Sequence, residues 1–132
     1  MSSPKTGKIL IVDDNDQMCS LLADILELFD YQAQHAKDGE EALSQLKAEK
    51  FDLVITDLRM PKMSGTELLK LIKQEQPHLP VVVVSGFTPG NTQNLIIGEQ
   101  ADGFLNKPFT VEQIEKMLKD LLGKDQSYFT AL

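Results

Sequence analysis

The sequence predicts a single α/β domain, in which helices cover both faces of a parallel sheet of five strands. The length of 132 residues suits one well-buried core and is too short for two. Short apolar, β-branched runs alternate with stretches whose apolar residues recur every three or four positions. Because the apolar runs are mostly unbroken, the strands should be buried on both faces, which is typical of a doubly wound parallel sheet.

The first half of the chain is expected to supply three strands, at residues 8–12, 31–36 and 53–55. Between the first two strands, either Asn15 or Asp16 can cap a helix. That helix should turn one apolar face inward, formed by Met18, Leu21, Leu22, Ile25, Leu26 and Phe29. A second helix opens at residues 38–41, with Ala42, Leu43 and Leu46 on its inner side.

The second half repeats the alternation. Residues 66–76 predict a third helix, which the prolines of residues 77–80 end, and residues 81–84 predict a fourth strand. Residues 91–100 are the weakest helix, because Pro89-Gly90 precede it and Gly98 lies inside it. A last strand at 103–106 precedes a helix that Thr110 caps and Gly123 ends. Its inward positions should be Val111, Ile114, Leu118, Leu121 and Leu122.

Composition excludes several classes of function. Lysine plus arginine number 13 against 20 aspartates and glutamates, for a net charge of −7, and no basic cluster favours direct binding of nucleic acid. The one cysteine, Cys19, rules out an internal disulfide and is expected inside a helix. No signal-peptide core and no run of about 18 apolar residues is present, so we expect a cytoplasmic protein without membrane contact.

Residues 1–7 are expected to be a flexible N-terminus and residues 8–123 the domain. Residues 124–132 are expected to be a tail or the start of a linker.

Polar side chains collect where the predicted strands end. Asp13 and Asp14 follow the first strand, Asp57 the third, Ser85 the fourth and Lys107 the fifth. Each has a simpler interpretation alone, as a helix cap, a turn residue or a solvated charge. Ligands of open α/β sheets bind at the carboxyl ends of the strands, so these residues together are better explained as one site.

Three carboxylates on neighbouring strand ends repel one another unless a cation lies among them. Their oxygen ligands suit Mg²⁺, which typically takes a few carboxylates and a phosphoryl oxygen. Lys107 offers a compact positive charge to a phosphoryl oxygen, and Ser85 offers a hydroxyl donor. This edge of the sheet can therefore receive a phosphoryl group.

Four motifs carry a resemblance to a known family: ILIVDDN, DLVITDLRMPKMSG, VVVVSG and GFLNKPF, in this order. With them the chain resembles the receiver domain of bacterial two-component response regulators, of the chemotaxis-regulator kind, from about residue 8 to residue 122. The resemblance implies a flavodoxin-like sheet of order 2-1-3-4-5, with Asp57 as the phosphoacceptor. It also implies that Asp13, Asp14 and Asp57 hold Mg²⁺ together with the backbone carbonyl of Arg59.

By the same resemblance, Ser85 is the switch hydroxyl, Phe104 the switch aromatic, and Lys107 precedes a cis-proline bond. The phosphoryl donor would be a phosphohistidine of a sensor histidine kinase or of a histidine phosphotransfer protein. His35 and His78 are interpreted as surface or packing residues. The protein would not be an enzyme beyond self-catalysed phosphotransfer and slow autodephosphorylation.

Phosphorylation should draw Ser85 toward the phosphoryl group and let Phe104 fill the space behind it. This would change the surface formed by helix 91–100, strand 103–106 and the final helix, where an unknown effector or a second copy could bind. In a helix, Leu95-Ile96-Ile97 would cover more of the circumference than one buried stripe. They therefore indicate either a contact with a partner or second copy, or a crowded core. Arg59 and Phe87 lie where a hydrolytic water would approach, which predicts slow dephosphorylation.

Two alternatives remain open at this point. Asp14 and Asp16 could be the nucleophile and acid of a haloacid-dehalogenase-type phosphatase, an interpretation that leaves Asp57 without a role. The chain could also be an interaction module that works without phosphorylation. The intact set of acids, hydroxyl and lysine argues against the second alternative.

Overall fold

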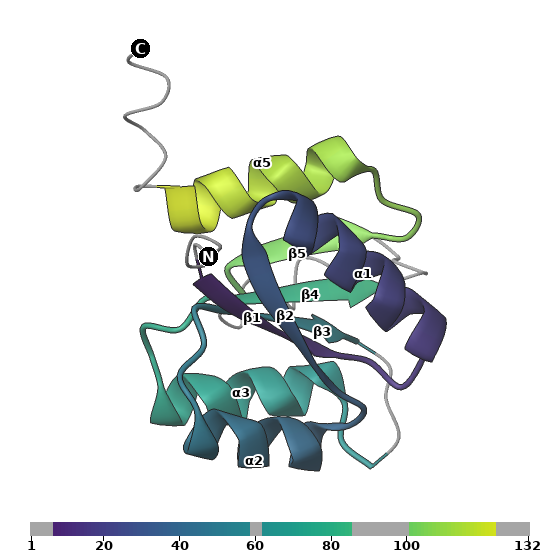
Figure 1. Cartoon of the computed structure of the whole chain (residues 1–132). Coiled ribbons are helices and arrows are strands. Elements are labelled where there is room, and N and C mark those ends of the chain that lie inside the picture. Colours follow the sequence, from purple (N-terminus) through teal and green to yellow (C-terminus); the bar gives the residue numbers. More distant parts are fainter. Residues whose placement is uncertain (1–6, 59–61, 86–100, 124–132) are drawn as a thin grey trace.

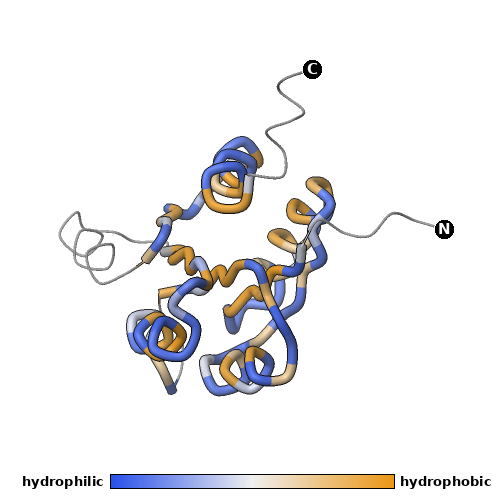
Figure 2. Tube along the Cα trace, turned by 90° about the vertical axis from the view of Figure 1, so that its left-hand side faces the viewer, coloured by the Kyte–Doolittle hydropathy of each residue, from blue (hydrophilic) through white to orange (hydrophobic). Residues whose placement is uncertain are grey.

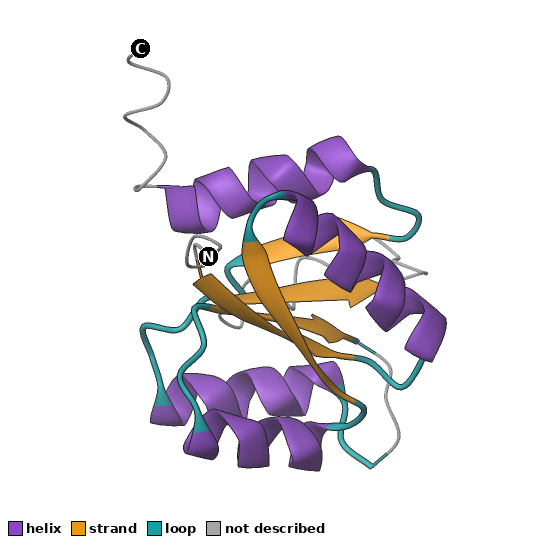
Figure 3. Cartoon of the chain, in the orientation of Figure 1, coloured by secondary structure: helices purple, strands orange, loops and turns teal. Residues whose placement is uncertain are grey.

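The computed structural model describes residues 7–58, 62–85 and 101–123, apart from the side chain of Ser85. The strands are β1 (Gly7–Val12), β2 (Tyr31–Ala36), β3 (Leu53–Asp57), β4 (Val81–Ser85) and β5 (Gly103–Asn106). The helices are α1 (Asp16–Leu28), α2 (Gly39–Ala48), α3 (Gly65–Glu75) and α5 (Val111–Leu122). Figure 1 labels these elements and Figure 3 shows their alternation along the chain. The expected helix at residues 91–100 lies outside the described residues.

All strand pairs of the sheet are parallel, and the order is β2-β1-β3-β4-β5. This confirms the doubly wound, flavodoxin-like sheet and the strand order that the resemblance implies. β1 pairs with β2 on one side and with β3 on the other, so the chain reverses direction across the sheet at β1. Such a reversal point is where open α/β sheets bind their ligands.

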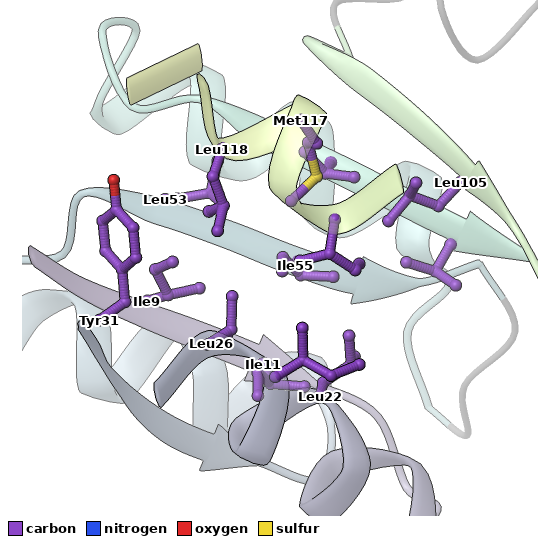
Figure 4. Packing of buried hydrophobic residues seen from close by; sticks show 14 of the residues in the cluster. Ile9, Ile11, Leu22, Leu26, Tyr31, Leu53, Ile55, Leu105, Met117 and Leu118 are labelled. Atoms are coloured by element: carbon purple, nitrogen blue, oxygen red, sulfur yellow. The ribbon is translucent and has the colours of Figure 1, made fainter. Parts of the chain in front are cut away.

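The sheet lies between two helical layers, α1 and α5 on one face and α2 and α3 on the other (Figure 1). Alternation along β1 divides its side chains: Ile9 and Ile11 face α1 and α5, while Leu10 and Val12 face the other layer. Figure 4 shows the hydrophobic cluster between the sheet and the α1–α5 layer. Leu22 and Leu26 of α1 and Met117 and Leu118 of α5 pack there against the same face of the strands. The central strands are thereby buried on both faces, as their unbroken apolar runs predict.

Two residues expected inside are not. Leu21 is 48% exposed and Val111 is 41% exposed. The buried residues of α1, Cys19, Leu22, Ile25 and Leu26, centre on one side of the helix, and Leu21 points about 100° away from that direction. Val111 is the first residue of α5, one turn before its first buried residue, Ile114. Figure 2 shows hydrophobic residues concentrated along the central strands, with the helices around them only partly hydrophobic.

Helix caps fix the turns that follow the strands. The side chain of Asn15 accepts a hydrogen bond from the amide of Met18, so Asn15 and not Asp16 caps α1. Ser64 and Thr110 form capping boxes with Glu67 and Gln113 at the starts of α3 and α5. α1 and α5 each begin within five residues of the end of the preceding strand, so these two caps lie near the carboxyl ends of the strands. Among the described residues, no helix is long and apolar enough to cross a membrane.

Candidate functional site

Three carboxylates gather at the carboxyl ends of β1 and β3. Asp13 and Asp14 directly follow β1, and Asp57 is the last residue of β3. Because β1 and β3 pair in parallel, their ends lie side by side at one edge of the sheet (Figure 1). One oxygen from each of the three carboxylates lies within 4.8 Å of the others. The structure thus brings together three acids that are up to 44 positions apart in the sequence.

The three acids differ in their exposure to water. Asp13 is 3% exposed, Asp57 is partly buried and Asp14 is exposed. Burial raises the pKa of the Asp13 carboxyl above its ordinary value, and the negative charges of Asp57 and Asp14 raise it further. A hydrogen bond from the Asn15 amide and the charge of Lys107 oppose this rise of the pKa without cancelling it. The cluster therefore carries negative charge that the protein compensates only in part.

Lys107 extends from the end of β5 to the same cluster. Its Nζ lies 3.6 Å from Oδ2 of Asp13 and 3.6 Å from Oδ2 of Asp57. The peptide bond between Lys107 and Pro108 is cis, as the resemblance implies. An ammonium group at equal distance from two carboxylates is placed to contact an anion bound between them.

Backbone contacts set the position of Asp57. The hydroxyl of Thr56 donates to the carbonyl of Asp57 at 3.0 Å, and the amide of Gly65 donates to the carbonyl of Leu58 at 2.9 Å. A Cβ on Gly65 would lie 2.4 Å from the carbonyl oxygen of Asp57 and 2.9 Å from Cα of Leu58. The start of α3 can approach the end of β3 this closely only because residue 65 has no side chain.

His35 lies nearer to the acids than the sequence indicates. Its Nε2 is 2.9 Å from the backbone carbonyl oxygen of Asp13. His35 is exposed, which agrees with its interpretation as a surface residue. Its contact with Asp13 is not expected from the sequence, because nothing in the pattern of β2 shows which residue of β1 lies beside it. The parallel register pairs His35 with Ile11, two residues before Asp13, and this register is the signal that could have located it.

Several other predicted site residues are only partly described. Phe104 is partly buried on β5 and packs against the cluster between the sheet and the α2–α3 layer. Ser85 ends β4, but its side chain lies outside the described residues, as do Arg59 and Phe87. Asp16 is the first residue of α1 and, within the described part of the chain, is not a member of the acidic cluster. This arrangement favours Asp57 over Asp14 and Asp16 as the centre of the site.

The acidic cluster fits a small divalent cation. All donors are carboxylate oxygens, the ligand type that Mg²⁺ prefers, and they lie close enough to bind one ion together. The raised pKa of Asp13 gives a second reason, because a cation would relieve the repulsion among the three acids. Such an acidic triad is typical of the Mg²⁺ site of receiver domains.

The fold and the acidic edge of the sheet are those of a receiver domain. The model of the response regulator receiver domain family matches residues 9–119, and the chain belongs to that family. It is accordingly a domain of two-component signalling whose acidic pocket is consistent with an aspartate phosphorylation site. Receiver domains act together with histidine kinases.

Two relatives illustrate how such domains are used. The chain is 32% identical over 119 residues to the alkaline phosphatase synthesis transcriptional regulatory protein PhoP of Bacillus subtilis, covering 90% of this chain and 50% of that protein. It is 28% identical over 120 residues to the polar-differentiation response regulator DivK of Brucella ovis, covering 89% of this chain and 98% of DivK. The chain therefore spans half the length of the first relative and nearly all of the second.

A solved structure gives the same result for the fold. The beryllofluoride-activated NtrC4 receiver domain dimer superposes with a TM-score of 0.84 at 32% identity, covering 89% of this chain and 97% of that one. Receiver domains of this kind can thus form dimers when activated.

Proposed function

We propose that this domain accepts a phosphoryl group on Asp57 from a phosphohistidine of a sensor histidine kinase or a histidine phosphotransfer protein. The observation that carries the proposal is the convergence of Asp13, Asp14 and Asp57 with the Nζ of Lys107, which lies 3.6 Å from two of the acids. Asp13 and Asp57 both contact Lys107, but Asp57 is partly buried whereas Asp13 is 3% exposed, so Asp57 is the more accessible of the two to a phosphoryl donor.

In the transfer, an oxygen of the ionised Asp57 carboxylate attacks phosphorus. A phosphorus–oxygen bond forms while the phosphorus–nitrogen bond to the donor imidazole breaks, and the electron pair leaves with the imidazole. No general base is needed, because the attacking carboxylate carries no proton. Lys107 contacts a phosphoryl oxygen through its ammonium group, and Ser85 donates its hydroxyl to another.

Asp13, Asp14 and Asp57, with the backbone carbonyl of Arg59, would hold Mg²⁺. When bound, the ion neutralises negative charge on the phosphoryl oxygens and orients them. The contribution of the chain itself is positional. Asp13 is held by its amide and carbonyl at the end of β1, and Asp57 is held at the end of β3 by Thr56 and Gly65.

The output of the domain is a change of surface. Movement of Ser85 toward the phosphoryl group lets Phe104 turn inward, which alters the face formed by β5 and α5. A hollow of about 320 Å³ between β5 and α5 supports this proposal, because it is lined by Phe104 and by residues of α5 such as Met117 and Leu121. The activated NtrC4 receiver domain is a dimer, which supports a second copy, besides a downstream effector, as a partner of this domain.

The test is to incubate the domain with Mg²⁺ and a small phosphodonor and to locate the adduct by mass spectrometry. We expect one hydroxylamine-labile phosphoryl group on Asp57, absent from Asp57→Asn and absent when Mg²⁺ is chelated. An adduct on Asp14 would support a phosphatase-like reaction instead. Absence of any adduct would support an interaction module that works without phosphorylation.

The lifetime of the phosphoryl group should be long. Arg59 and Phe87 follow Asp57 and Ser85 by two positions each, and their bulk should hinder the approach of a hydrolytic water. Arg59→Ala and Phe87→Ala should each shorten the lifetime of phospho-Asp57, measured by loss of label in excess Mg²⁺. Unchanged lifetimes in both variants would contradict this steric argument.

A further inference from the structure

We propose that His35 is a positioning residue for the acidic cluster, because its Nε2–H donates a hydrogen bond to the backbone carbonyl of Asp13. Through this bond, the edge strand β2 would fix the direction in which the Asp13 carboxylate points. The inference rests on the proposed function, since it concerns the same Mg²⁺ site.

Asp13 lies where regular hydrogen bonding stops. β1 ends at Val12 and α1 begins at Asp16, so the carbonyl of Asp13 falls between the ladder of the sheet and the first turn of the helix. Two side chains reach it, Nε2 of His35 at 2.9 Å and Sγ of Cys19 at 3.5 Å. A thiol is a weak donor, so the imidazole provides the principal hydrogen bond to this buried residue.

The chemistry of the partner fixes the tautomer of His35. A carbonyl oxygen only accepts hydrogen bonds, so Nε2 must carry a proton in this contact. This can be measured without reference to phosphorylation.

β2 holds the backbone of Asp13 at both polar groups. The amide of Asp13 donates to the carbonyl of Ala36 at 3.0 Å, and the carbonyl of Asp13 accepts from the adjacent His35. The side chain of Gln45, on α2, donates in turn to the carbonyl of His35 at 2.9 Å. The peptide groups on either side of Asp13 therefore cannot rotate without breaking a contact to β2.

This restraint acts on the carboxylate of Asp13. Oδ1 accepts from the amide of Asn15 at 2.9 Å, and Oδ2 lies 3.6 Å from Nζ of Lys107. If the hydrogen bond from His35 is lost, the peptide between Asp13 and Asp14 can turn, and the two acids lose their common orientation toward a cation. Loss of a partner that orients a metal ligand commonly weakens metal binding by about 10- to 100-fold.

The experiment measures Mg²⁺ binding to the unphosphorylated domain by amide chemical-shift titration. We expect His35→Leu to weaken binding by about tenfold. His35→Gln retains a nitrogen donor at similar reach and should recover most of the affinity. Gln32→Leu, an exposed position on the same strand, is the matched control and should change the affinity by no more than about twofold.

A second measurement uses the wild-type domain alone. Long-range ¹H–¹⁵N correlation of the histidine rings should show His35 with its proton on Nε2. If His35→Leu does not fold, His35→Asn replaces it in the comparison with His35→Gln, because the shorter amide cannot reach the carbonyl.

Two results would overturn the inference: Mg²⁺ affinity equal to wild type in the variants that lack the donor, or a His35 proton on Nδ1 alone. Suppose the wild type binds Mg²⁺ and forms phospho-Asp57, and the variants that lack the donor bind Mg²⁺ equally well. Only the role of His35 then fails. If the wild type does neither, the proposed function fails and the inference fails with it.

Discussion

Lys107 is the residue whose position most constrains the chemistry of the site. Its Nζ lies at the same distance, 3.6 Å, from Asp13 and from Asp57, so it partly neutralises both the proposed metal ligands and the proposed nucleophile. A fixed ammonium competes with a divalent cation for the same carboxylates. The same ammonium assists when an anionic phosphoryl group arrives.

We therefore predict opposite effects of Lys107→Met on two properties. Mg²⁺ should bind the variant several-fold more tightly, because the competing positive charge is gone. Phosphorylation of Asp57 should slow by about 100-fold, because one preorganised donor to the phosphoryl oxygens is missing. Chemical-shift titration with Mg²⁺ and the rate of adduct formation measure the two properties separately.

Lys116→Met is the matched control, because it removes an exposed lysine of α5 that pairs with Asp120. It should leave both properties near wild type. Weaker Mg²⁺ binding in Lys107→Met would contradict the competition between the lysine and the ion.

At the scale of elements, the contact between the end of β3 and the start of α3 decides where Asp57 lies. Gly65→Ala would place a Cβ 2.4 Å from the carbonyl oxygen of Asp57, and neither backbone can yield without moving the strand end. We predict a loss of stability of about 1–3 kcal/mol, the usual cost of overpacking, together with slower phosphorylation. Urea unfolding followed by circular dichroism measures the first effect.

The control for this substitution is Gly123→Ala at the end of α5. A Cβ there would meet Cβ of Lys119 at 3.4 Å, an ordinary contact, so the change should be nearly neutral. If Gly65→Ala were as stable as Gly123→Ala, the close approach of α3 to β3 would not be a constraint on the site.

The elements also show which structural features the sequence can predict. β2 and β5 have the predicted bounds, because residues typical of turns border each of them, although neither strand is an unbroken apolar run. Asp13, Asp14, Asp57 and Lys107 could be located because every strand end in a parallel sheet meets the same edge. The strand order came from the resemblance, since periodicity does not state which strands are neighbours.

Other features depend on register and direction in space. The contact of His35 with Asp13 requires the pairing of β2 with β1, which no local pattern specifies. The exposure of Leu21 follows from the rotation of α1 about its axis, which is set by packing against β1 and α5. Position 65 requires glycine because a side chain there would meet the backbone of Asp57 and Leu58. From the sequence alone, Gly65 is only a typical loop residue.

For the molecule as a whole, the acidic cluster should lower stability when no cation is bound. The pKa of Asp13 is higher in the folded state than its ordinary value, chiefly through burial, so folding favours the neutral carboxyl. Above a pH of about 4, stability should fall as pH rises through this raised pKa. At neutral pH the ionised Asp13 thus opposes folding.

Asp13→Asn should therefore stabilise the Mg²⁺-free domain at pH 7, by on the order of 1 kcal/mol, while its Oδ1 can still accept from the Asn15 amide. Mg²⁺ at 100 times its dissociation constant should add about 2.7 kcal/mol to the wild type and less to the variant, which lacks one carboxylate. Thermal unfolding with and without Mg²⁺ measures both effects. Asp24→Asn, on the exposed side of α1, controls for the general loss of one negative charge. If Asp13→Asn is less stable than wild type without Mg²⁺, the acidic cluster does not destabilise the domain. The three acids would then not be kept together at a cost in stability for the binding of a cation and a phosphoryl group.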